Sequence, residues 1–349
     1  MNKEIFIDGK RIGGDSPTFI IAEMSANHLM SFDRAKEIIY RLKDSGTDAV
    51  KLQTYTADTI TIDCDRPEFR IHGGLWDGET RYALYEKAYT PWEWQKDLME
   101  YAGSLGMICF SSPFDLTAVD FMEDIGMPAY KVASYEIFDI PMIRKIAGKG
   151  KPIIFSTGVA YMEDVERALK VCKEEENEDV ILLKCTSAYP CPYEDMNIRT
   201  IPLMSETYDC ITGLSDHTFG SEVALGAVAL GAKVVEKHVT LKRSDGGPDG
   251  AFSMEMEEFI DMVRQIRNLE KALGRGNFEL TPKQINEREN GRSLYVVKDI
   301  KQGDRFTADN VRSIRPGFGM HPMYYEEILG KRARKDIKRG EPLRWELID

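Results

Sequence analysis

The sequence predicts an α/β protein whose main domain is a (β/α)8 barrel, with an N-terminal β-hairpin and a small C-terminal β-rich domain. Two observations predict the barrel. Eight short apolar segments, typical of buried parallel strands, follow one another within about 275 residues, and segments of helical period separate most of them. Polar or ionisable residues stand at the end of every apolar segment, where barrel enzymes keep their chemistry.

The predicted elements follow in chain order. Strand-like alternation of side-chain type in residues 4–12 flanks an Asp8-Gly9 turn, and this pattern indicates a hairpin. The predicted strands are 19–23, 49–53, 107–111, 129–133, 152–156, 180–185, 211–214 and 233–238. Helical period is clearest in 32–45, 92–105 and 162–173. A doubly wound sheet is the alternative, but it usually has fewer strands and a glycine-rich first turn, and neither GxGxxG nor GxxxxGK[ST] occurs.

The chain changes character after residue 273. A polar stretch, 281–292, leads into a segment in which Lys298-Asp-Ile-Lys-Gln-Gly303 recurs 37 residues later as Lys335-Asp-Ile-Lys-Arg-Gly340. The repeat predicts a small β-rich domain with approximate internal twofold symmetry. We therefore expect a catalytic barrel over 1–275, a linker over 276–291 and a C-terminal domain over 292–349.

Composition limits the function classes. The chain has 349 residues, 42% of them hydrophobic, and a net charge of -12, which argues against general binding of nucleic acid. The six cysteines form no CxxC pair, the N-terminus lacks a signal-peptide core, and no apolar run approaches the roughly 20 residues of a membrane span. We expect a cytoplasmic, reduced protein without membrane contact. From Gly291 onward 13 Lys/Arg face 9 Asp/Glu, which favours either docking on the acidic barrel or a solvated basic face.

Two histidines at the ends of the last two predicted strands are the first candidates for chemistry. His217 follows 211–214, and His238 ends 233–238. The carboxyl ends of barrel strands meet at one face, so the two imidazoles should lie close together. Two neutral imidazoles with waters can hold a divalent metal and leave a position open for a Lewis acid. A lone histidine is more often a satisfied core residue, but the pair favours a metal.

Two lysines at strand ends, Lys51 and Lys131, suit a bound phosphate. The hydroxyl donors expected near them are those of Ser112, Ser134 and Ser215. Alternatively, the lysines are buried ion-pair partners of Glu23 and Glu136. In a cationic surrounding Glu136 can carry a proton or merely pair with Lys131, and the residues alone leave both roles open.

Ordered motifs on successive predicted strands resemble the sialic acid synthase family. They are Ile21-Ala-Glu23-Met-Ser-Ala-Asn27-His28, Lys51-Leu-Gln53, Ser111-Ser-Pro-Phe114, Lys131-Val-Ala-Ser134-Tyr-Glu136, Ser156-Thr-Gly158, Gly213-Leu-Ser-Asp-His-Thr218 and Glu236-Lys-His238. The resemblance covers nearly the whole chain, since the C-terminal piece with Arg315-Pro-Gly317 is similar to the antifreeze-like (SAF) domain of that family. Segments 70–77 and 88–93 resemble most the pseudaminic acid synthase branch.

The resemblance implies a TIM barrel with a SAF domain and a transferase reaction. Family members condense phosphoenolpyruvate with the open-chain aldehyde of an N-acetylated amino sugar, release phosphate and form a nine-carbon α-keto acid. For the pseudaminic branch the implied acceptor is 2,4-diacetamido-2,4,6-trideoxy-β-L-altropyranose. N-acetylneuraminate or legionaminate synthesis from another N-acetylated hexose is the alternative.

The resemblance also implies roles for individual residues. The implied catalytic residues are Glu136, Glu23, His217 and His238, of which the histidines would hold Mn2+, Mg2+ or Co2+. Phosphoenolpyruvate would be bound by Lys51, Ser112, Lys131, Ser134, Ser187 and Ser215. The sugar side would be lined by Glu23, Gln53, Tyr189, Asp249 and Arg315. In the family this arginine reaches the acyl group of the sugar from the partner subunit, which implies a homodimer with swapped C-terminal domains; a solvent-exposed Arg-Pro turn is the alternative.

Departures from the neuraminate pattern bear on the choice of sugar. Ser187 and Gly74 stand where that branch commonly has asparagine, and Phe318-Gly-Met-His321 replaces a more polar motif. A less polar pocket fits a 6-deoxy sugar, and Trp76 can pack on its methyl group or simply anchor its loop.

Three other functions compete with the synthase. They are a metal-dependent hydrolase on the same barrel, a synthase for sugar-phosphate acids, and a non-catalytic carbohydrate- or ice-binding protein. Release of phosphate from phosphoenolpyruvate separates a synthase from the hydrolase and the binding protein.

Overall fold

The computed structural model describes residues 3–349, which divide into two compact units. The first unit ends at Gly274, and the second runs Arg275–Asp349. Each unit has its own hydrophobic core, so each is described by itself.

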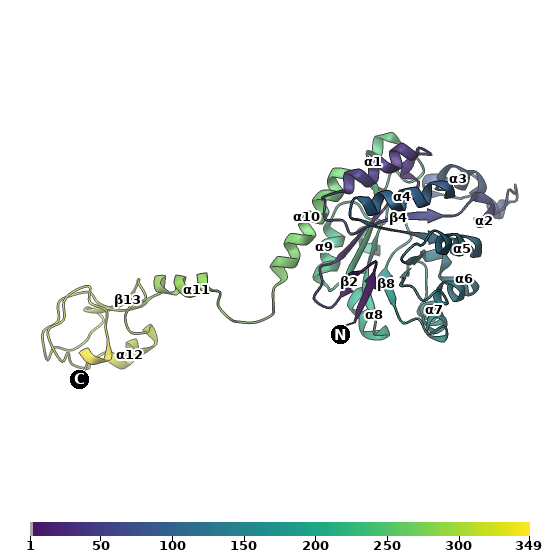
Figure 1. The fold of residues 1–349 in the computed structure, drawn as a ribbon. Coiled ribbons are helices and arrows are strands. Elements are labelled where there is room, and N and C mark those ends of the chain that lie inside the picture. The colour runs from purple at the N-terminus through teal and green to yellow at the C-terminus, as the bar shows by residue number, and fades with distance from the viewer. Residues whose placement is uncertain (1–2) are drawn as a thin grey trace. The chain divides into compact units, whose positions relative to one another are not determined.

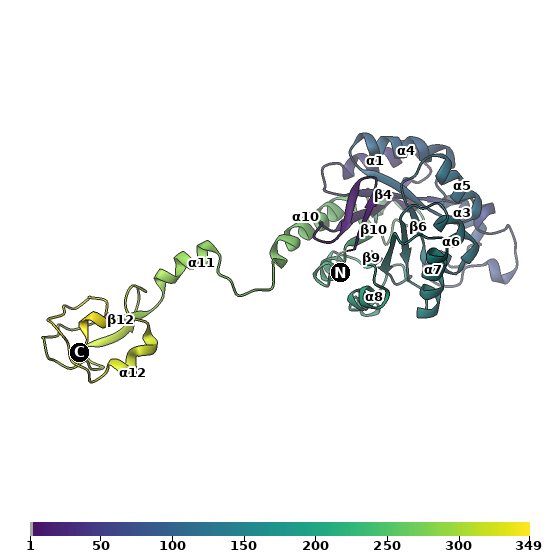
Figure 2. The same ribbon diagram turned by 60° about the horizontal axis from the view of Figure 1, so that its bottom comes forward.

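The first unit is a closed parallel barrel. Its eight strands are β3 Phe19–Glu23, β4 Ala49–Thr54, β5 Ile108–Pro113, β6 Tyr130–Val132, β7 Ile153–Ser156, β8 Val180–Lys184, β9 Ile211–Asp216 and β10 Val234–Thr240. Each strand pairs in parallel with the next, and β10 pairs with both β9 and β3, which closes the ring (Figures 1 and 2). The predicted barrel is confirmed, because an open doubly wound sheet lacks that closing pair. A short strand, β11 Met254–Glu255, adds to the carboxyl end of β10.

The hairpin predicted for 4–12 is confirmed, and it closes the amino-terminal end of the barrel. Strands β1 Glu4–Ile7 and β2 Lys10–Gly13 pair antiparallel with Ile5 opposite Ile12. Asp8 and Gly9 both have positive φ, of 46° and 75°, which is the conformation that a two-residue Asp-Gly turn requires. The hairpin isoleucines are buried in one cluster with inward-facing residues of the barrel strands.

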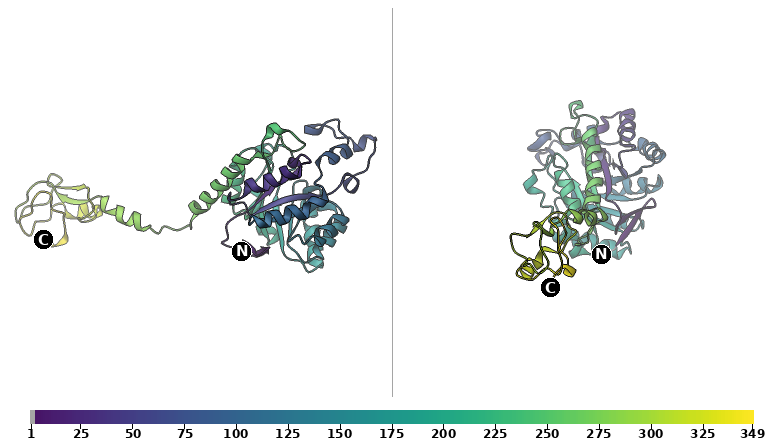
Figure 3. Two further views of the ribbon diagram at one scale, coloured as in Figure 1. Left: turned by 45° about the horizontal axis from the view of Figure 1, so that its top comes forward. Right: turned by 90° about the vertical axis from the view of Figure 1, so that its left-hand side faces the viewer.

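Helices cover the outside of the strand ring. They are α1 Phe32–Leu42, α2 Ala57–Ile60, α3 Arg81–Ala88, α4 Trp92–Ser104, α5 Leu116–Asp124, α6 Ile140–Ala147, α7 Met162–Glu174, α8 Thr200–Tyr208, α9 Glu222–Ala229 and α10 Met256–Leu273. In α1 the Ser31 hydroxyl accepts the Arg34 amide at 3.3 Å as an N-cap. The buried residues of α1 recur at helical period and face the sheet, and α10 lies beside α1 (Figure 3).

The second unit is small and pseudosymmetric. Its elements are α11 Pro282–Glu287, β12 Ser293–Val296, β13 Val311–Ile314 and α12 Tyr325–Ile328. The two copies of the repeat pair antiparallel through Ile300 and Ile337, whose amides and carbonyls bond reciprocally at 2.9 Å. Equivalent ion pairs flank them, Lys301 with Asp336 at 2.7 Å and Lys338 with Asp299 at 3.0 Å. These exchanged contacts confirm the predicted internal twofold symmetry.

No helix in residues 3–349 is long and apolar enough to cross a membrane. All six cysteines are free thiols, and five of them are buried.

Candidate active site

A cavity of about 830 Å3 lies at the carboxyl ends of the barrel strands. The sequence-predicted residues that line it are Lys51, Gln53, Lys131, Ser134, Glu136, Ser187, Tyr189, Ser215, His217, His238 and Asp249. Glu23 and Ser112 are not among the lining residues, because both are buried below it. Arg315 belongs to the second unit, where it is exposed. The barrel therefore brings nearly all residues that the sequence singled out to one end, and those that line the cavity come from the carboxyl ends of β4, β6, β8, β9 and β10 or from the segments that follow them.

Lys51 is the centre of a buried charge network. Its Nζ lies 2.8 Å from Glu23 Oε2, 3.3 Å from Glu236 Oε1 and 3.3 Å from Ser112 Oγ. Burial raises the pKa of Glu23 to about 7, and Lys51 opposes that shift. Burial also acts to raise the pKa of Glu236. The positive charges of Lys131 and Lys51 outweigh this effect, so the pKa of Glu236 is lowered. The ion-pair interpretation thus holds for Lys51 and Glu23, while the second carboxylate is Glu236 and not Glu136.

Lys131 faces hydroxyl and carbonyl oxygens rather than a close carboxylate. Its Nζ donates to Ser156 Oγ at 2.7 Å and to the Val132 carbonyl at 3.1 Å, and it lies 4.0 Å from Glu236 Oε1. Burial lowers the pKa of this ammonium group to about 8. The neighbouring Ser134 hydroxyl accepts the Gly158 amide at 3.0 Å. A cation that is only partly balanced at a cavity wall is a binding point for an anion.

Glu136 enters the cavity without a partner. Its Oε2 is buried and has no hydrogen-bond partner, and no carboxylate–cation pair forms at Glu136 in residues 3–349. The alternative that it merely pairs with Lys131 is therefore wrong. Burial raises the pKa of the Glu136 carboxyl to about 7, so it exchanges a proton near neutral pH.

The two histidines meet across adjacent strands. Their ring centroids are 5.3 Å apart. His217 Nδ1 lies 3.0 Å from the Thr186 carbonyl oxygen, which can only accept, so Nδ1 carries the proton and Nε2 is left with a free lone pair. His238 Nδ1 is buried without a partner, and burial together with His217 holds the pKa of His238 well below its ordinary value.

The imidazole pair fits a divalent metal. Neutral nitrogen donors are what such ions require, and the two rings are near enough for one ion. Within the described residues no group of three or more His, Cys, Asp or Glu side chains could hold a metal.

The opposite polar wall is built from β3, β4 and the loop after β10. Gln53 Nε2 donates to Glu23 Oε1 at 2.9 Å and to Ser25 Oγ at 3.3 Å. Asp249 accepts the Ser25 hydroxyl, and it accepts the Ala26 amide at 3.2 Å. The expected position of Glu23 on the sugar side needs correction, because Glu23 is fully buried and Gln53 is the group that reaches the cavity.

The outer part of the cavity is aromatic. The ring centroid of Tyr189 lies 4.4 Å from that of His217 and 5.0 Å from that of Phe252. Trp76 donates its indole N–H to the Pro248 carbonyl at 2.9 Å and lies 6.0 Å from Tyr189. Trp76 is therefore anchored by its own hydrogen bond and also presents a face to the cavity.

Several site residues escaped the sequence-based interpretation. Ser25 lines the cavity in a left-handed backbone conformation with φ 49°, which nothing in the sequence indicates. Cys185 Sγ lies 3.8 Å from His217 Nδ1. Phe252 completes the aromatic wall. Glu236 was noted near the end of the predicted strand 233–238 and in the Glu236-Lys-His238 motif, but neither signal indicated its contact with Lys51.

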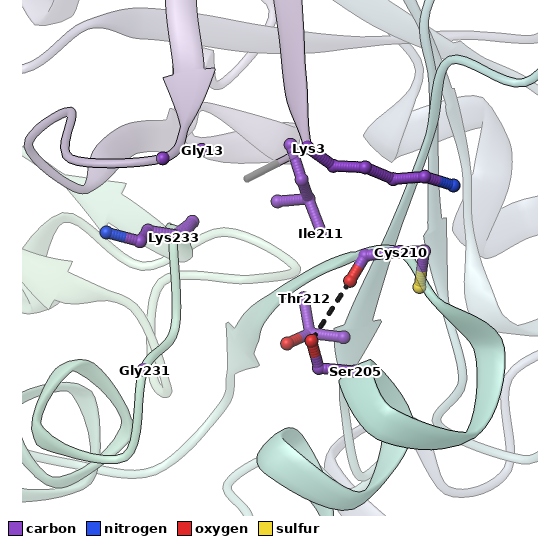
Figure 4. Close-up of a pocket in the computed structure, with 9 residues that line it drawn as sticks. Lys3, Gly13, Ser205, Cys210, Ile211, Thr212, Gly231 and Lys233 are labelled. Carbon is purple, nitrogen blue, oxygen red and sulfur yellow. Dashed lines mark hydrogen bonds between the residues drawn. The ribbon is translucent and has the colours of Figure 1, made fainter. Parts of the chain in front are cut away.

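A second, smaller cavity of about 100 Å3 lies near the amino-terminal ends of the strands, by the hairpin (Figure 4). The ammonium groups of Lys3 and Lys233 point in opposite directions there. Ser205 donates to the Cys210 carbonyl at 3.2 Å. A Cβ on Gly13 would lie 2.2 Å from the Lys3 carbonyl oxygen, so the chain is tightly packed here. Since its cations do not converge, this cavity is not a second candidate site.

Known proteins share this architecture. The model of the NeuB family matches residues 38–278, and that of the SAF domain matches 291–349. The chain is 47% identical to the pseudaminic acid synthase of Campylobacter jejuni (95% of this chain, 96% of the relative) and 43% identical to that of Helicobacter pylori (94% and 96%). The crystal structure of N-acetylneuraminic acid synthetase from Leptospira borgpetersenii superposes with a TM-score of 0.73 at 30% identity, covering 82% of this chain and 95% of that one.

Proposed function

The chain belongs to the NeuB family, and from this premise we propose that it is a pseudaminic acid synthase. It condenses phosphoenolpyruvate with the open-chain aldehyde of 2,4-diacetamido-2,4,6-trideoxy-β-L-altropyranose and water, giving pseudaminic acid and phosphate. The observation that carries the proposal is the barrel-end cavity, which combines two lysines, two imidazoles and the Glu136 carboxyl, whose buried Oε2 has no hydrogen-bond partner.

Phosphoenolpyruvate occupies the lysine side of the cavity. It carries a phosphate and a carboxylate, so both ends need cationic neighbours, and Lys51 and Lys131 provide them. The hydroxyl donors that would complete its binding are Ser112, Ser134, Ser187 and Ser215. The buried Ser187 hydroxyl has no hydrogen-bond partner in the protein, which supports a role in binding substrate.

Glu136 moves the protons of the second half of the reaction. The enol carbon C3 first attacks the sugar aldehyde, whose oxygen takes up a proton from solvent, and C2 becomes cationic. Water then adds to C2 as Glu136 accepts one of its protons, which it later returns to solvent. The tetrahedral intermediate breaks the bond between C2 and the phosphate oxygen, and its hydroxyl proton leaves with the phosphate, so that C2 becomes the keto carbon. A carboxyl with a pKa of about 7 is suited to both accepting and returning that proton.

His217 and His238 are the residues that would hold the divalent ion, which when bound supplies a Lewis acid for the aldehyde oxygen. His217 is fixed in its ligating tautomer by the Thr186 carbonyl. Mn2+, Mg2+ and Co2+ all suit two imidazoles with oxygen ligands.

The sugar occupies the wall formed by Gln53, Tyr189 and Asp249, with Glu23 acting through Gln53. Its methyl and acetyl groups face the apolar part of the lining, which is formed by Ile71, Leu75, Trp76, Tyr85, Phe114 and Phe252, while His72 and Arg81 also line the cavity. An apolar lining favours the trideoxy sugar over a hexose with a hydroxyl at C6.

Arg315 contacts the acyl group of the sugar from the second subunit of a homodimer with swapped C-terminal domains. Its exposure within its own unit supports this role, since a buried arginine would be unavailable. The free cysteines fit a reducing cytoplasm as the place of reaction.

The experiment that tests the function is phosphate release from phosphoenolpyruvate with Mn2+, comparing the diacetamido sugar with N-acetylmannosamine. Release with the diacetamido sugar alone is expected, and a chelator should abolish it until Mn2+ is returned. Release with N-acetylmannosamine alone would contradict the sugar assignment but keep the chemistry. Release with neither would refute the proposal and favour the metal-dependent hydrolase.

A further inference from the structure

A buried ion pair lies on the outer side of the two strands that carry the histidines. Asp216 precedes His217 at the end of β9, Lys237 precedes His238 on β10, and the two are opposite each other in register. Successive side chains of a strand point to opposite faces, so the histidines face the cavity while Asp216 and Lys237 face the helix layer. Lys237 Nζ lies 2.6 Å from Asp216 Oδ2, and the side chains are 2% and 0% exposed.

This pair holds the backbone on both sides of His217. Asp216 Oδ1 accepts the Thr218 amide at 2.9 Å and the Thr218 hydroxyl at 2.8 Å. Lys237 Nζ donates a second bond to the Thr218 carbonyl at 2.6 Å. A single ammonium group on β10 thus contacts the residue before His217 and the residue after it.

The backbone alone does not provide that link. Pairing between β9 and β10 ends at Asp216 and Lys237, one residue before each histidine. Beyond that point the Lys237 side chain continues the connection, through Thr218. Burying two opposite charges costs desolvation and adds little net stability compared with apolar side chains of similar size. The hydrogen bonds that the Asp216–Lys237 pair makes to Thr218 therefore indicate that the pair fixes the local backbone geometry.

We propose that Asp216 and Lys237 are positioning residues that set the separation of the His217 and His238 imidazoles for one divalent ion. The inference rests on the metal site of the proposed function, and it assigns to this pair no contact with substrate. Residues that orient metal-binding histidines from behind change metal affinity when they are replaced, even though they never touch the ion.

The test compares Mn2+ affinity, phosphoenolpyruvate affinity and melting temperature in the full-length protein, all without turnover. The main variant is Asp216→Leu/Lys237→Met, which removes both charges and leaves neither buried alone. Lys237→Arg is the conservative variant, because its planar guanidinium keeps the charge but not the compact ammonium geometry. Asp48→Asn/Arg267→Met is the control at the opposite end of the barrel, where Asp48 precedes β4 and lies 3.1 Å from Arg267 and 2.8 Å from Lys10.

The expected result is a loss of Mn2+ affinity of roughly 10- to 100-fold in the apolar variant, a smaller loss in Lys237→Arg, and none in the control. Phosphoenolpyruvate affinity should stay at the wild-type value, whereas general damage to the barrel would lower both affinities. Wild-type Mn2+ affinity in the apolar variant overturns the inference, and if that variant fails to fold, Lys237→Arg decides alone. Undiminished Mn2+ binding by His217→Ala/His238→Ala overturns the metal site itself and with it the positioning role.

Discussion

At the residue scale, burial sets the properties of Glu136. Its pKa of about 7 lies above the ordinary 4.5 because burial outweighs the opposing effects of its own backbone hydrogen bond and of Lys131. The folded state therefore binds more protons than the unfolded state between these two values, and stability falls as pH rises through them. Above pH 7 the ionised group lowers the stability of the fold, which is the cost of keeping a usable proton carrier in the site.

Replacing Glu136 by Gln should separate the effect of the carboxyl on stability from its effect on turnover. Glu136→Gln removes the ionisable group, so we expect the variant to exceed wild type in unfolding free energy by on the order of 3 kcal/mol at pH 8, and by nothing near pH 4.5. Its turnover should fall by roughly 100-fold or more. Chemical denaturation at both pH values checks stability, with the exposed Glu206→Gln as control. Full turnover in Glu136→Gln would contradict the proton role.

The indole of Trp76 should determine which sugar is accepted. Trp76→Ala leaves the Lys51 side of the cavity intact but removes apolar surface near Tyr189 and Phe252. We expect the KM of the diacetamido sugar to rise about tenfold while the KM of phosphoenolpyruvate stays constant, since a buried methyl contact is worth about 1–3 kcal/mol. Steady-state kinetics with each substrate varied in turn measures the two values. An equal rise in both would show that Trp76 only anchors its loop.

At the scale of elements, the close approach of strands β8, β9 and β10 depends on Gly213. A Cβ at this position would lie 2.3 Å from the Val234 carbonyl oxygen and 2.8 Å from Leu183 Cδ2. Backbone cannot yield as a flexible side chain does, so only glycine lets these strands pair. His217 follows β9 and His238 lies on β10, so the distance between these strands also affects the distance between the two imidazoles.

Gly213→Ala should therefore destabilise the barrel. We expect a loss of about 1–3 kcal/mol from overpacking, with weaker Mn2+ binding as the strands separate. Thermal and denaturant unfolding measure the first effect and titration with Mn2+ the second. Gly103→Ala in α4 is the matched control, since nothing lies within 4 Å of its added Cβ, and alanine there should be neutral or stabilising by up to about 1 kcal/mol. Wild-type stability in Gly213→Ala would contradict the packing argument.

At the scale of the whole molecule, the proposed swapped dimer makes each active site a product of two chains. Glu136 would come from one subunit and Arg315 from the other. The Arg315→Ala variant should lose roughly 10- to 150-fold in kcat/KM for the sugar, the value of a charge-assisted hydrogen bond. The neighbouring exposed Arg312→Ala should not.

Mixed dimers test the exchange directly. Arg315→Ala and Glu136→Gln are each expected to be nearly inactive, but a heterodimer would contain one site with both native residues if the domains are swapped. Random mixing of co-expressed subunits should restore about a quarter of wild-type activity. No recovery, with heterodimers demonstrated by differential tagging, would place both residues in the same subunit.

Local sequence patterns suffice for the order and type of the elements and for most of the residues that line the site, although Ser25, Cys185 and Phe252 were not predicted. The hairpin at Asp8-Gly9, the eight strands and the repeat around Ile300 and Ile337 all follow local patterns of burial and turn chemistry. In a parallel barrel all strands end at one face, so strand-end residues form one site whatever their distance along the chain.

Which groups meet within that site follows from the closed barrel and could not be predicted from the sequence. The pairing of Lys51 with Glu236, the lack of a partner for Glu136 and the Asp216–Lys237 contact depend on barrel closure and strand register. Interactions between ionisable groups vary over a few ångströms and with the degree of burial, and neither quantity is encoded by local sequence. Periodicity can place a side chain at the end of a strand, but only the closed barrel sets its neighbours and therefore its charge.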